Sequence, residues 1–407
     1  MAHIKDILGY KKEVEKLKSV CDFLKNTEKY IDFGVELPHC LLICGERGVG
    51  KTLMMEALAE DCEREIFNTH HRDLSINRIR KVFKIAREAE PSIVLIDDIN
   101  YLDKDNDKDL DIYWQLVDEI NSYKNGEVFV VITVNDRENL PDYLMDQLDS
   151  DMIIELQPPK IEEACEIFKP IFDENKLSKD FNINDFCCFA RDMTYLYAND
   201  TFNNAARLAI YEGQKRVSMQ HLIKAGLLLK GYELAVEFDP VTAYHEAGHA
   251  AVNLLLGGDA AFIVLLDSGG GYFKEKDLKT KTYYDKERRY IVSVAGKACE
   301  EIFTGTSSIG SYSDLSRVSV AIEDDVKILA SQGFEYFDST ELNSPAYNDS
   351  LAKKVQADLQ KYYDTAKELI IKNKLLIETF VDKLKDKFYL LHSEIYNIYN
   401  DYIARKI

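Results

Sequence analysis

Gly45-Glu46-Arg47-Gly48-Val49-Gly50-Lys51-Thr52 decides the fold of the first part of this chain, because it matches the phosphate-binding loop Gly-x4-Gly-Lys-Thr at every fixed position. The apolar residues 41–43 before it predict a buried strand, and residues 53–59 after it predict a helix. A strand, a glycine-rich loop and a helix in this order are the context that the motif needs. The alternative is a glycine-rich turn that binds no ligand.

The residues of this loop have distinct roles in binding ATP. Backbone N–H groups around Gly45, Gly48 and Gly50, together with the N-terminus of the following helix, would surround the phosphates. Lys51 would neutralise the β- and γ-phosphate oxygens, and the Thr52 hydroxyl would bind Mg²⁺. The loop therefore predicts a site for magnesium–ATP.

Two further strands complete the predicted nucleotide site. Residues 93–96 form an apolar run that ends in Asp97 and Asp98, and Asp97 would hold the Mg²⁺ shell. Residues 128–134 predict another strand, which would deliver Asn135 to the same edge of the sheet. We therefore assign Asp97, Asp98 and Asn135 to nucleotide binding with the loop.

A second motif, His245-Glu246-Ala247-Gly248-His249, has the His-Glu-x-x-His pattern of zinc peptidases. Residues four apart on a helix face the same way, so His245 and His249 can bind one Zn²⁺ ion. Glu246 can reach a metal-bound water and take its proton, which is the role of a general base. Asp239-Pro240 predicts the start of the helix. The alternative is two histidines that share a helix by chance.

Composition limits the classes of partner and compartment. The chain has 407 residues and a formal net charge of −20, which argues against nucleic acid and anionic membrane surfaces. The most apolar stretch, residues 247–266, is interrupted by polar side chains and predicts core, so we expect no membrane insertion. The N-terminus has no signal-peptide pattern. The eight cysteines form no Cys-x-x-Cys pair, and several lie within apolar patterns, which predicts buried, reduced thiols in a cytoplasmic protein.

Periodicity divides the chain into three predicted domains. Strand and helix patterns alternate up to residue 157, which predicts a parallel sheet flanked by helices. Helical periods then cover residues 162–172, 184–191, 202–214 and 219–230. The predicted domains are a nucleotide-binding core at 1–157, a helical lid at 158–232 and a mostly helical metallopeptidase domain at 238–407, which ends in a long segment from residue 348.

With both motifs placed, the chain resembles the cytosolic part of the FtsH family of AAA+ ATP-dependent zinc metalloproteases. Ile7-Leu8-Gly9-Tyr10 is similar to the family segment that packs against adenine. Residues 243–250 are close to the protease signature, and residues 295–301 resemble a Gly-Gly-x-Ala-Ala-Glu-Glu helix of the family. The resemblance implies an α/β P-loop core with a helical lid, followed by a zincin-like domain, and the cofactors Zn²⁺, ATP and Mg²⁺.

The resemblance also supplies a third zinc ligand. In the family this ligand is an aspartate in an Asn/Ser-Asp-Leu sequence after a glycine-rich loop, and Ser313-Asp314-Leu315 occupies that position. Asp314 is therefore the expected ligand. The alternatives are that Asp314 caps a helix N-terminus, or that Asp324 or Asp325 serves as the ligand.

The departures from the family affect the ATPase half. Asp97-Asp98 replaces the usual Asp-Glu, and a carboxylate that is one methylene shorter can lower the rate roughly a hundredfold. Asp146 and Asp149 align with the two arginine fingers that act across the subunit interface. His71-Arg72-Asp73 aligns with the substrate-gripping pore loop, and Tyr195-Leu196-Tyr197 with a Gly-Ala-Asp sensor. Because the sequence begins at the ATPase module, we also expect this chain to lack the family's membrane anchor.

These features predict an ATP-dependent zinc metalloendopeptidase that degrades protein or peptide substrates, with a slow or degenerate motor. The resemblance implies a homo-hexamer or a mixed ring with relatives. The alternatives are a zinc peptidase that uses nucleotide only for assembly, and a chaperone-like scaffold without proteolysis. Arg137 is a candidate replacement for a missing finger, or a surface ion-pair residue. Residues 269–273 predict a turn and an exposed strand, which in the family pairs with substrate.

Overall fold

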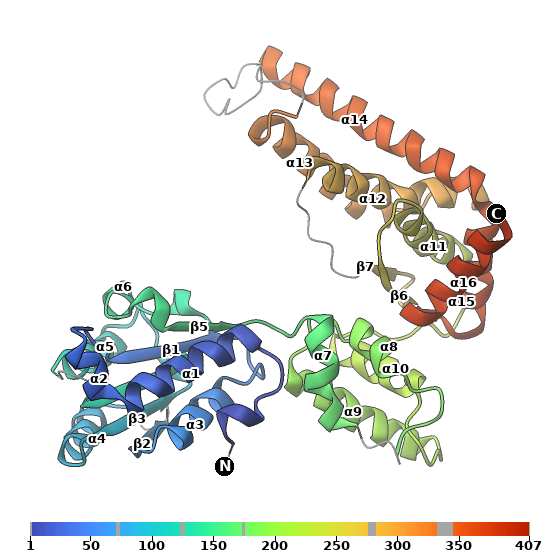
Figure 1. The fold of residues 1–407 in the computed structure, drawn as a ribbon. Helices are drawn as coiled ribbons and strands as arrows, with labels where there is room; N and C mark the ends of the chain where they lie inside the picture. The colour runs from blue at the N-terminus through green and yellow to red at the C-terminus, as the bar shows by residue number, and fades with distance from the viewer. Residues whose placement is uncertain are drawn as a thin grey trace. The chain divides into compact units, whose positions relative to one another are not determined.

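The chain forms two compact units, traced in Figure 1. The computed structural model describes residues 2–70, 74–122, 127–172, 176–275, 282–331 and 345–406. The first unit comprises residues 1–174 and 190–203, and the second comprises residues 175–189 and 204–407. This division cuts through the predicted lid, and the three domain boundaries drawn from the sequence stay a prediction.

A five-stranded sheet in the order β2-β3-β4-β1-β5 forms the centre of the first unit. Its strands are β1 (Cys40–Gly45), β2 (Glu65–His70), β3 (Ser92–Asp97), β4 (Val128–Val134) and β5 (Ile153–Leu156). Every neighbouring pair is parallel, so the carboxyl ends of β1, β3 and β4 lie at one edge. The parallel sheet that the alternating patterns predicted is confirmed.

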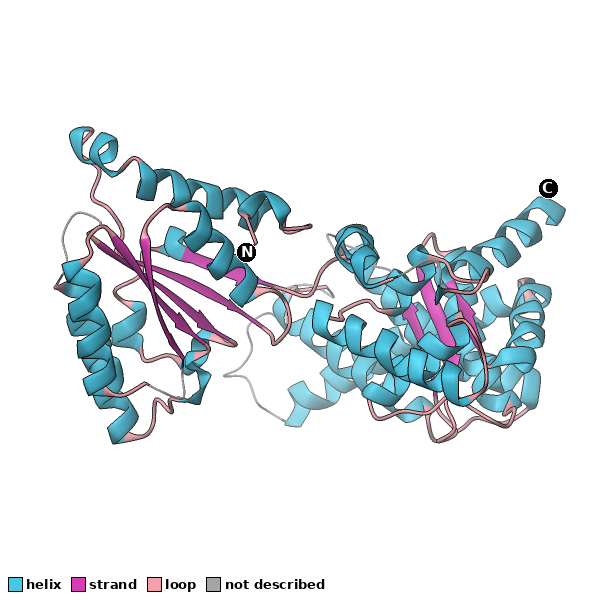
Figure 2. Cartoon of the chain, turned by 90° about the horizontal axis from the view of Figure 1, so that it is seen from below, coloured by secondary structure: helices cyan, strands magenta, loops and turns pink. Residues whose placement is uncertain are grey.

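Helices cover both faces of this sheet (Figure 2). They are α1 (Lys11–Lys25), α2 (Thr27–Asp32), α3 (Lys51–Asp61), α4 (Ile76–Glu88), α5 (Asp107–Asn121) and α6 (Asp142–Met145), with the short 3-10 turns η1 (Ile4–Asp6), η3 (Ile99–Tyr101), η4 (Arg137–Asn139) and η5 (Ser150–Met152). Cys40, Leu42 and Cys44 of β1 share a core with α4 and α5. Leu41 and Ile43 alternate with them, point to the opposite face and are also fully buried. Burial on both faces explains why the strands are continuously apolar.

One aromatic pair lies on the surface of this unit. Trp114 of α5 stacks on Tyr143 of α6, with ring centroids 3.9 Å apart and planes 4° from parallel. Trp114 is half exposed and is the single tryptophan of the chain. The pair joins α5 to the short helix that directly precedes Asp146.

The predicted lid region is helical. It contains α7 (Ile161–Phe168), the 3-10 turn η6 (Lys169–Ile171), α8 (Ile183–Phe189), α9 (Tyr195–Tyr211) and α10 (Met219–Leu229). The sequence placed the third of these helices at 202–214, whereas α9 begins at Tyr195. Polar residues in the first half of α9 hide its apolar period, which explains why the sequence analysis missed this part. In the structure, residues 195–197 form the first turn of this long helix. There the Tyr197 N–H donates to the Thr194 hydroxyl at 3.4 Å.

The second unit packs helices around a small antiparallel sheet. Its later elements are α11 (Pro240–Leu255), β6 (Ala260–Leu265), β7 (Gly271–Glu275), α12 (Tyr283–Thr304), α13 (Ser311–Ile328), α14 (Pro345–Lys372), α15 (Lys374–Lys387), β8 (Tyr389–Leu391) and α16 (His392–Lys406). The sheet order is β7-β6-β8. Helix α11 lies against α12 at Gly248, where a Cβ atom would stand 2.6 Å from Cys299 Cβ and 2.9 Å from the Ala295 carbonyl oxygen. Glycine is therefore required for this close helix contact.

The last segment is mostly helical, as predicted, and contains one short strand that the sequence analysis did not place. Phe388 ends α15 in the left-handed region with φ of 65°, and residues 389–391 then pair with residues 262–264 of β6. A strand of three residues is too short to produce an alternating pattern, so periodicity could not predict it.

Two further expectations concern membranes and cysteines. None of the helices in the described ranges is long and apolar enough to cross a bilayer. All eight cysteines are free, and seven of them are buried. The prediction of buried thiols is therefore confirmed, and residues 247–266, which form most of α11 and β6, are core as predicted.

Candidate metal centre and nucleotide pocket

Helix α11 presents the His-Glu-x-x-His residues to the interior of the second unit. Asp239 caps the helix by accepting hydrogen bonds from the N–H groups of Val241 at 3.0 Å and Thr242 at 3.3 Å. One turn further on, His245 and His249 are both 8% exposed. Their rings lie edge to face with centroids 4.5 Å apart, so the two imidazoles face one point.

Helix α13 brings Asp314 to the same point. Asp314 Oδ2 lies 3.2 Å from His245 Nε2 and 3.4 Å from His249 Nε2, and the two Nε2 atoms are 2.9 Å apart. Ligand atoms on a tetrahedral Zn²⁺ ion with bonds of about 2.0–2.1 Å stand about 3.3 Å from one another. The three atoms therefore fit one face of a zinc coordination tetrahedron, and they form the single such group found among the described residues.

The alternatives for Asp314 do not agree with the structure. The N-cap of α13 is Gly310, and Asp314 lies inside the first turn of the helix. Asp324 is exposed, and Asp325 is 1% exposed and accepts hydrogen bonds from Tyr290 and Lys286 of α12. Neither belongs to the group of potential ligands found among the described residues. The residue that the family resemblance indicated is therefore the one that lies beside the two histidines.

The hydrogen bonds that His245 and His249 make through Nδ1 determine which ring nitrogen carries the proton. His249 Nδ1 lies 2.6 Å from the Val292 carbonyl oxygen, which can only accept, so Nδ1 carries the proton. His245 Nδ1 lies 2.7 Å from a Glu300 carboxylate oxygen and donates to it in the same way. With these protons assigned to Nδ1 from their partners, both Nε2 atoms are available to bind a metal ion. Two imidazole nitrogens and a carboxylate oxygen at these separations form a donor set that fits Zn²⁺.

The pKa shifts of His245 and Asp314 also indicate that this centre favours a positive charge. Burial opposes protonation of His245, but hydrogen bonds with Asp314 and Glu300 outweigh it and raise the pKa of His245 to about 10. Burial also acts against the charged form of Asp314, yet hydrogen bonds from both histidines hold its pKa well below the usual range. The centre is therefore built to stabilise a cation beside a carboxylate.

Glu246 is the buried carboxyl group next to this centre. It is 5% exposed, and burial raises its pKa against the opposing effect of the two histidines. The backbone N–H of Phe273 in β7 donates a hydrogen bond to it. A carboxylate with a raised pKa in this position is suited to accept and return a proton.

Glu300 was not assigned a role from the sequence. It is fully buried on α12, where one oxygen accepts from the Ser308 hydroxyl at 2.7 Å and the other from the Ser308 N–H. Burial raises its pKa, but the hydrogen bonds from His245 and Ser308 outweigh this effect and lower it. An ionised Glu300 thus fixes the orientation of His245. The only signal in the sequence was its place in the segment 295–301.

Two glycines leave room for these side chains, and sequence reasoning missed both. A Cβ atom at Gly296 of α12 would stand 2.5 Å from His245 Cε1 and 2.6 Å from each ring nitrogen. A Cβ atom at Gly271 of β7 would stand 2.6 Å from Glu246 Cγ. Real Cβ contacts are never this short, so any larger residue would displace the imidazole or the carboxylate.

A cavity of about 330 Å³ opens at the centre. Its lining includes the three potential ligands and Glu246, the turn and strand 269–273, and Arg317 of α13. Strand β7 lies at one edge of the sheet, since β6 separates it from β8. The predicted edge strand is thus present beside the metal centre, where an extended peptide could add to it.

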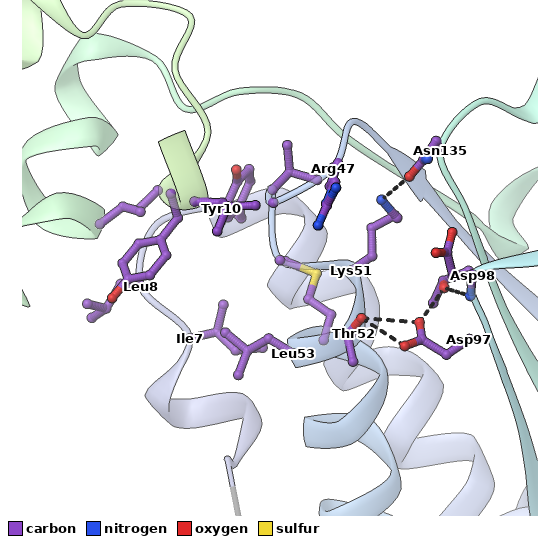
Figure 3. Close-up of a pocket in the computed structure, with 18 of the residues that line it drawn as sticks. Ile7, Leu8, Tyr10, Arg47, Lys51, Thr52, Leu53, Asp97, Asp98 and Asn135 are labelled. Carbon is purple, nitrogen blue, oxygen red and sulfur yellow. Dashed lines mark hydrogen bonds between the residues drawn. The ribbon is translucent and has the colours of Figure 1, made fainter. Parts of the chain in front are cut away.

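The first unit contains a larger pocket of about 940 Å³ around the phosphate-binding loop (Figure 3). Lys51 is 8% exposed, and burial lowers its pKa. Its Nζ donates to the carbonyl oxygens of Gly45 at 2.7 Å and Glu46 at 3.1 Å, and to Asn135 Oδ1 at 2.8 Å. The loop, its lysine and Asn135 therefore meet at the carboxyl ends of β1 and β4, as the motif predicted.

The predicted Mg²⁺ residues also meet in this pocket. The Thr52 hydroxyl donates to Asp97, with both carboxylate oxygens 3.1 Å away, and Thr133 holds the same carboxylate at 2.6 Å. Asp98 lines the pocket in a left-handed conformation with φ of 61°, and its N–H donates to Thr133 at 2.8 Å. One Asp98 carboxylate oxygen is buried without a hydrogen-bond partner.

The other ATPase positions singled out in the sequence differ in whether they line this pocket. Ile7, Leu8 and Tyr10 line an apolar side of the pocket, as the resemblance to an adenine-packing segment implies. Asp146 and Asp149 are exposed and do not line it. Residues 71–73, which align with the pore loop, lie outside the described residues.

Comparisons with known proteins give matches in both units of the chain. The family model "ATPase family associated with various cellular activities (AAA)" matches residues 41–156. Over 98% of its length the chain is 25% identical to ATP-dependent zinc metalloprotease FtsH 2 of Thermoanaerobacter sp. strain X514, and the match covers 82% of that protein.

Two other relatives are similarly distant. FtsH of Streptobacillus moniliformis is 26% identical over 96% of this chain, with 63% of the relative covered. FtsH of Helicobacter pylori strain J99 is 25% identical over 98% of this chain, with 71% of the relative covered. The match to the AAA family model shows an AAA domain, and the similarity along nearly the whole chain supports the resemblance to FtsH proteins that the two motifs predicted.

Proposed function

We propose that this chain is a zinc metalloendopeptidase that cleaves protein or peptide substrates in its second unit and binds magnesium–ATP in its first. The observation that carries the proposal is the convergence of His245 Nε2, His249 Nε2 and Asp314 Oδ2, which stand 2.9–3.4 Å apart. The names of the relatives support the same activity.

Five residues share the peptidase chemistry. His245, His249 and Asp314 would hold Zn²⁺, which when bound polarises a carbonyl and lowers the pKa of water. Glu246 would take a proton from the attacking water and return it to the leaving amine, because burial places its pKa above that of an ordinary carboxyl group. Glu300 would keep His245 in the tautomer whose Nε2 faces the centre.

The edge of β7 would bind the substrate. An extended peptide that pairs with this strand makes backbone hydrogen bonds, which select for extended chains and only weakly for side chains. The scissile bond would then lie over the cavity that Glu246 lines.

The first unit would bind magnesium–ATP through Lys51, Thr52 and Asp97. Asp98 in place of glutamate, and carboxylates at 146 and 149, predict slow hydrolysis, because a carboxylate cannot stabilise the developing negative charge on a phosphate. Assembly as a homo-hexamer, or as a mixed ring with relatives that supply arginines, remains part of this proposal. The competing functions are nucleotide-driven assembly without hydrolysis and a scaffold without proteolysis.

Metal removal tests the peptidase assignment. We expect the purified protein to contain about one zinc ion per chain, and chelation followed by dialysis to abolish cleavage of an unfolded protein such as casein. Zinc should restore it. Metal content by mass spectrometry and cleavage by gel electrophoresis are the measurements. Cleavage that persists in metal-free protein would refute the zinc mechanism, and stoichiometric zinc without any cleavage would favour the scaffold.

Lys51→Ala tests the nucleotide site. The variant should bind magnesium–ATP at least about tenfold more weakly, because it loses a charged hydrogen-bond donor to the phosphates. Isothermal calorimetry measures the affinity. Lys18→Ala, which alters an exposed ion pair on α1, is the matched control and should bind like the unaltered chain. Equal affinities of the two variants would show that ATP does not occupy this loop.

A further inference from the structure

The nucleotide pocket has two cationic side chains among its described lining residues, Lys51 and Arg47. Lys51 is buried and bonded to the loop carbonyls and Asn135. Arg47 is exposed, and within the described part of the chain no hydrogen bond or ion pair holds its guanidinium group. Arg47 is therefore the cation in the pocket that is available to a ligand.

The position of Arg47 in the loop determines which part of a ligand it can reach. It lies between Gly45 and Gly48, inside the segment whose backbone N–H groups would surround the phosphates. Figure 3 shows its side chain directed into the space that Tyr10 and Lys51 also line. Because Lys51 lines the same space, a guanidinium group there would lie close to bound phosphates. It belongs to the same chain as the loop itself.

The rest of the pocket is short of positive charge. Asp6, Asp97 and Asp98 also line it, and the surface positions at which an arginine from a neighbouring subunit is expected carry Asp146 and Asp149. A triphosphate transition state needs charge stabilisation at the γ-phosphate, and lysine alone supplies a point charge. An arginine in the loop's own chain would supply the positive charge that the subunit interface lacks.

We propose that Arg47 is a catalytic residue for ATP hydrolysis and acts in cis on the γ-phosphate of the nucleotide bound by its own chain. This inference rests on the proposed binding of ATP. In the reaction, the oxygen of a water molecule forms a bond to Pγ while the bond from Pγ to the β–γ bridging oxygen breaks. ADP leaves with the bonding electron pair, and the proton of the water passes to the released phosphate. The planar guanidinium group donates two parallel hydrogen bonds to the phosphate oxygens as their charge grows.

A cis arginine changes how turnover depends on assembly. When the essential arginine comes from a neighbour, hydrolysis per chain rises steeply as subunits associate. When it belongs to the nucleotide-binding loop, each chain has its own complete set of cations. We expect ATP turnover per chain to change less than twofold across the protein concentrations at which the chain assembles.

The test compares Arg47→Ala and Arg47→Lys in the full chain. Arg47→Ala should bind ATP within about threefold of the unaltered affinity, hydrolyse it at least about a hundredfold more slowly, and lose binding of ADP–aluminium fluoride, a mimic of the transition state. Arg47→Lys should retain ATP binding without restoring the rate, because an ammonium group lacks the bidentate fork. Free guanidinium ions should partly restore hydrolysis by Arg47→Ala. Casein cleavage by the zinc centre checks that each variant is folded.

Arg137→Ala tests the competing candidate for a replaced arginine finger, since Arg137 follows β4 and is also exposed. It should keep both the rate and ADP–aluminium fluoride binding. Hydrolysis by Arg47→Ala at the unaltered rate, or a loss of rate in Arg137→Ala instead, would overturn the inference while leaving the nucleotide site intact. Failure of the unaltered chain to bind ATP would instead contradict the proposed nucleotide function itself.

Discussion

Glu246→Gln is expected to lower peptide cleavage by roughly 10²–10⁴-fold, the contribution of a positioned general base, while zinc stays bound. Glutamine has nearly the shape of glutamate but cannot accept the proton. It can still accept the hydrogen bond from the Phe273 N–H through its amide oxygen. The three metal-binding atoms are unchanged, so loss of activity would separate the base from the ligands.

The measurement is kcat for a fluorogenic peptide together with zinc content. Glu301→Gln makes the same chemical change on α12, outside the lining of the cavity, and is the matched control. Its activity should remain close to that of the unaltered protein. A Glu246→Gln protein with full activity would show that a different group takes the proton, and one without zinc would show that Glu246 organises the metal site.

Three glycines should give three different results, because each faces a different side chain. Gly296→Ala should weaken zinc binding about 10–100-fold, since its Cβ would displace the His245 ring, which lies 2.5 Å away. Gly271→Ala should keep zinc but lower kcat by about a hundredfold, since its Cβ would displace Glu246, whose Cγ lies 2.6 Å away.

Gly270→Ala is the control within the same turn. Its nearest neighbour to a new Cβ is Ser268 Oγ at 3.9 Å, an ordinary contact, so zinc affinity and kcat should both be retained. Competition with a zinc chelator measures affinity, and peptide cleavage measures kcat. Equal behaviour of Gly270→Ala and Gly271→Ala would mean that the Glu246 carboxylate is mobile and that its observed position is not required for catalysis.

The fold of the first unit could be predicted from the sequence because the patterns that indicate it are local. A glycine-rich loop between an apolar strand and a helix, and the alternation of strands with helices, are properties of neighbouring residues. The second unit gave weaker signals. Strand β8 has three residues within a helical segment, and it forms only because β6, more than 100 positions earlier, offers an edge to pair with.

The residues of the candidate metal centre were likewise predictable from the sequence only in part. His245, Glu246 and His249 follow from spacing on one helix turn. Asp314 lies 69 positions after His245, and only the resemblance to a family indicated it. Glu300, Gly296 and Gly271 depend on how α12 and β7 pack against α11, which no pattern along the chain describes. The arrangement of side chains around the ligands is thus a property of the packed unit.

Trp114, stacked on Tyr143, is an intrinsic fluorescence probe of the first unit. With one tryptophan in the chain, selectively excited emission comes from a single place, the surface that α5 shares with the short helix before Asp146. Any event that covers this surface or separates the two rings would shift the colour or intensity of that emission. Association of chains through the Asp146 face could therefore be followed in unlabelled protein, during nucleotide addition and without disturbing the zinc centre.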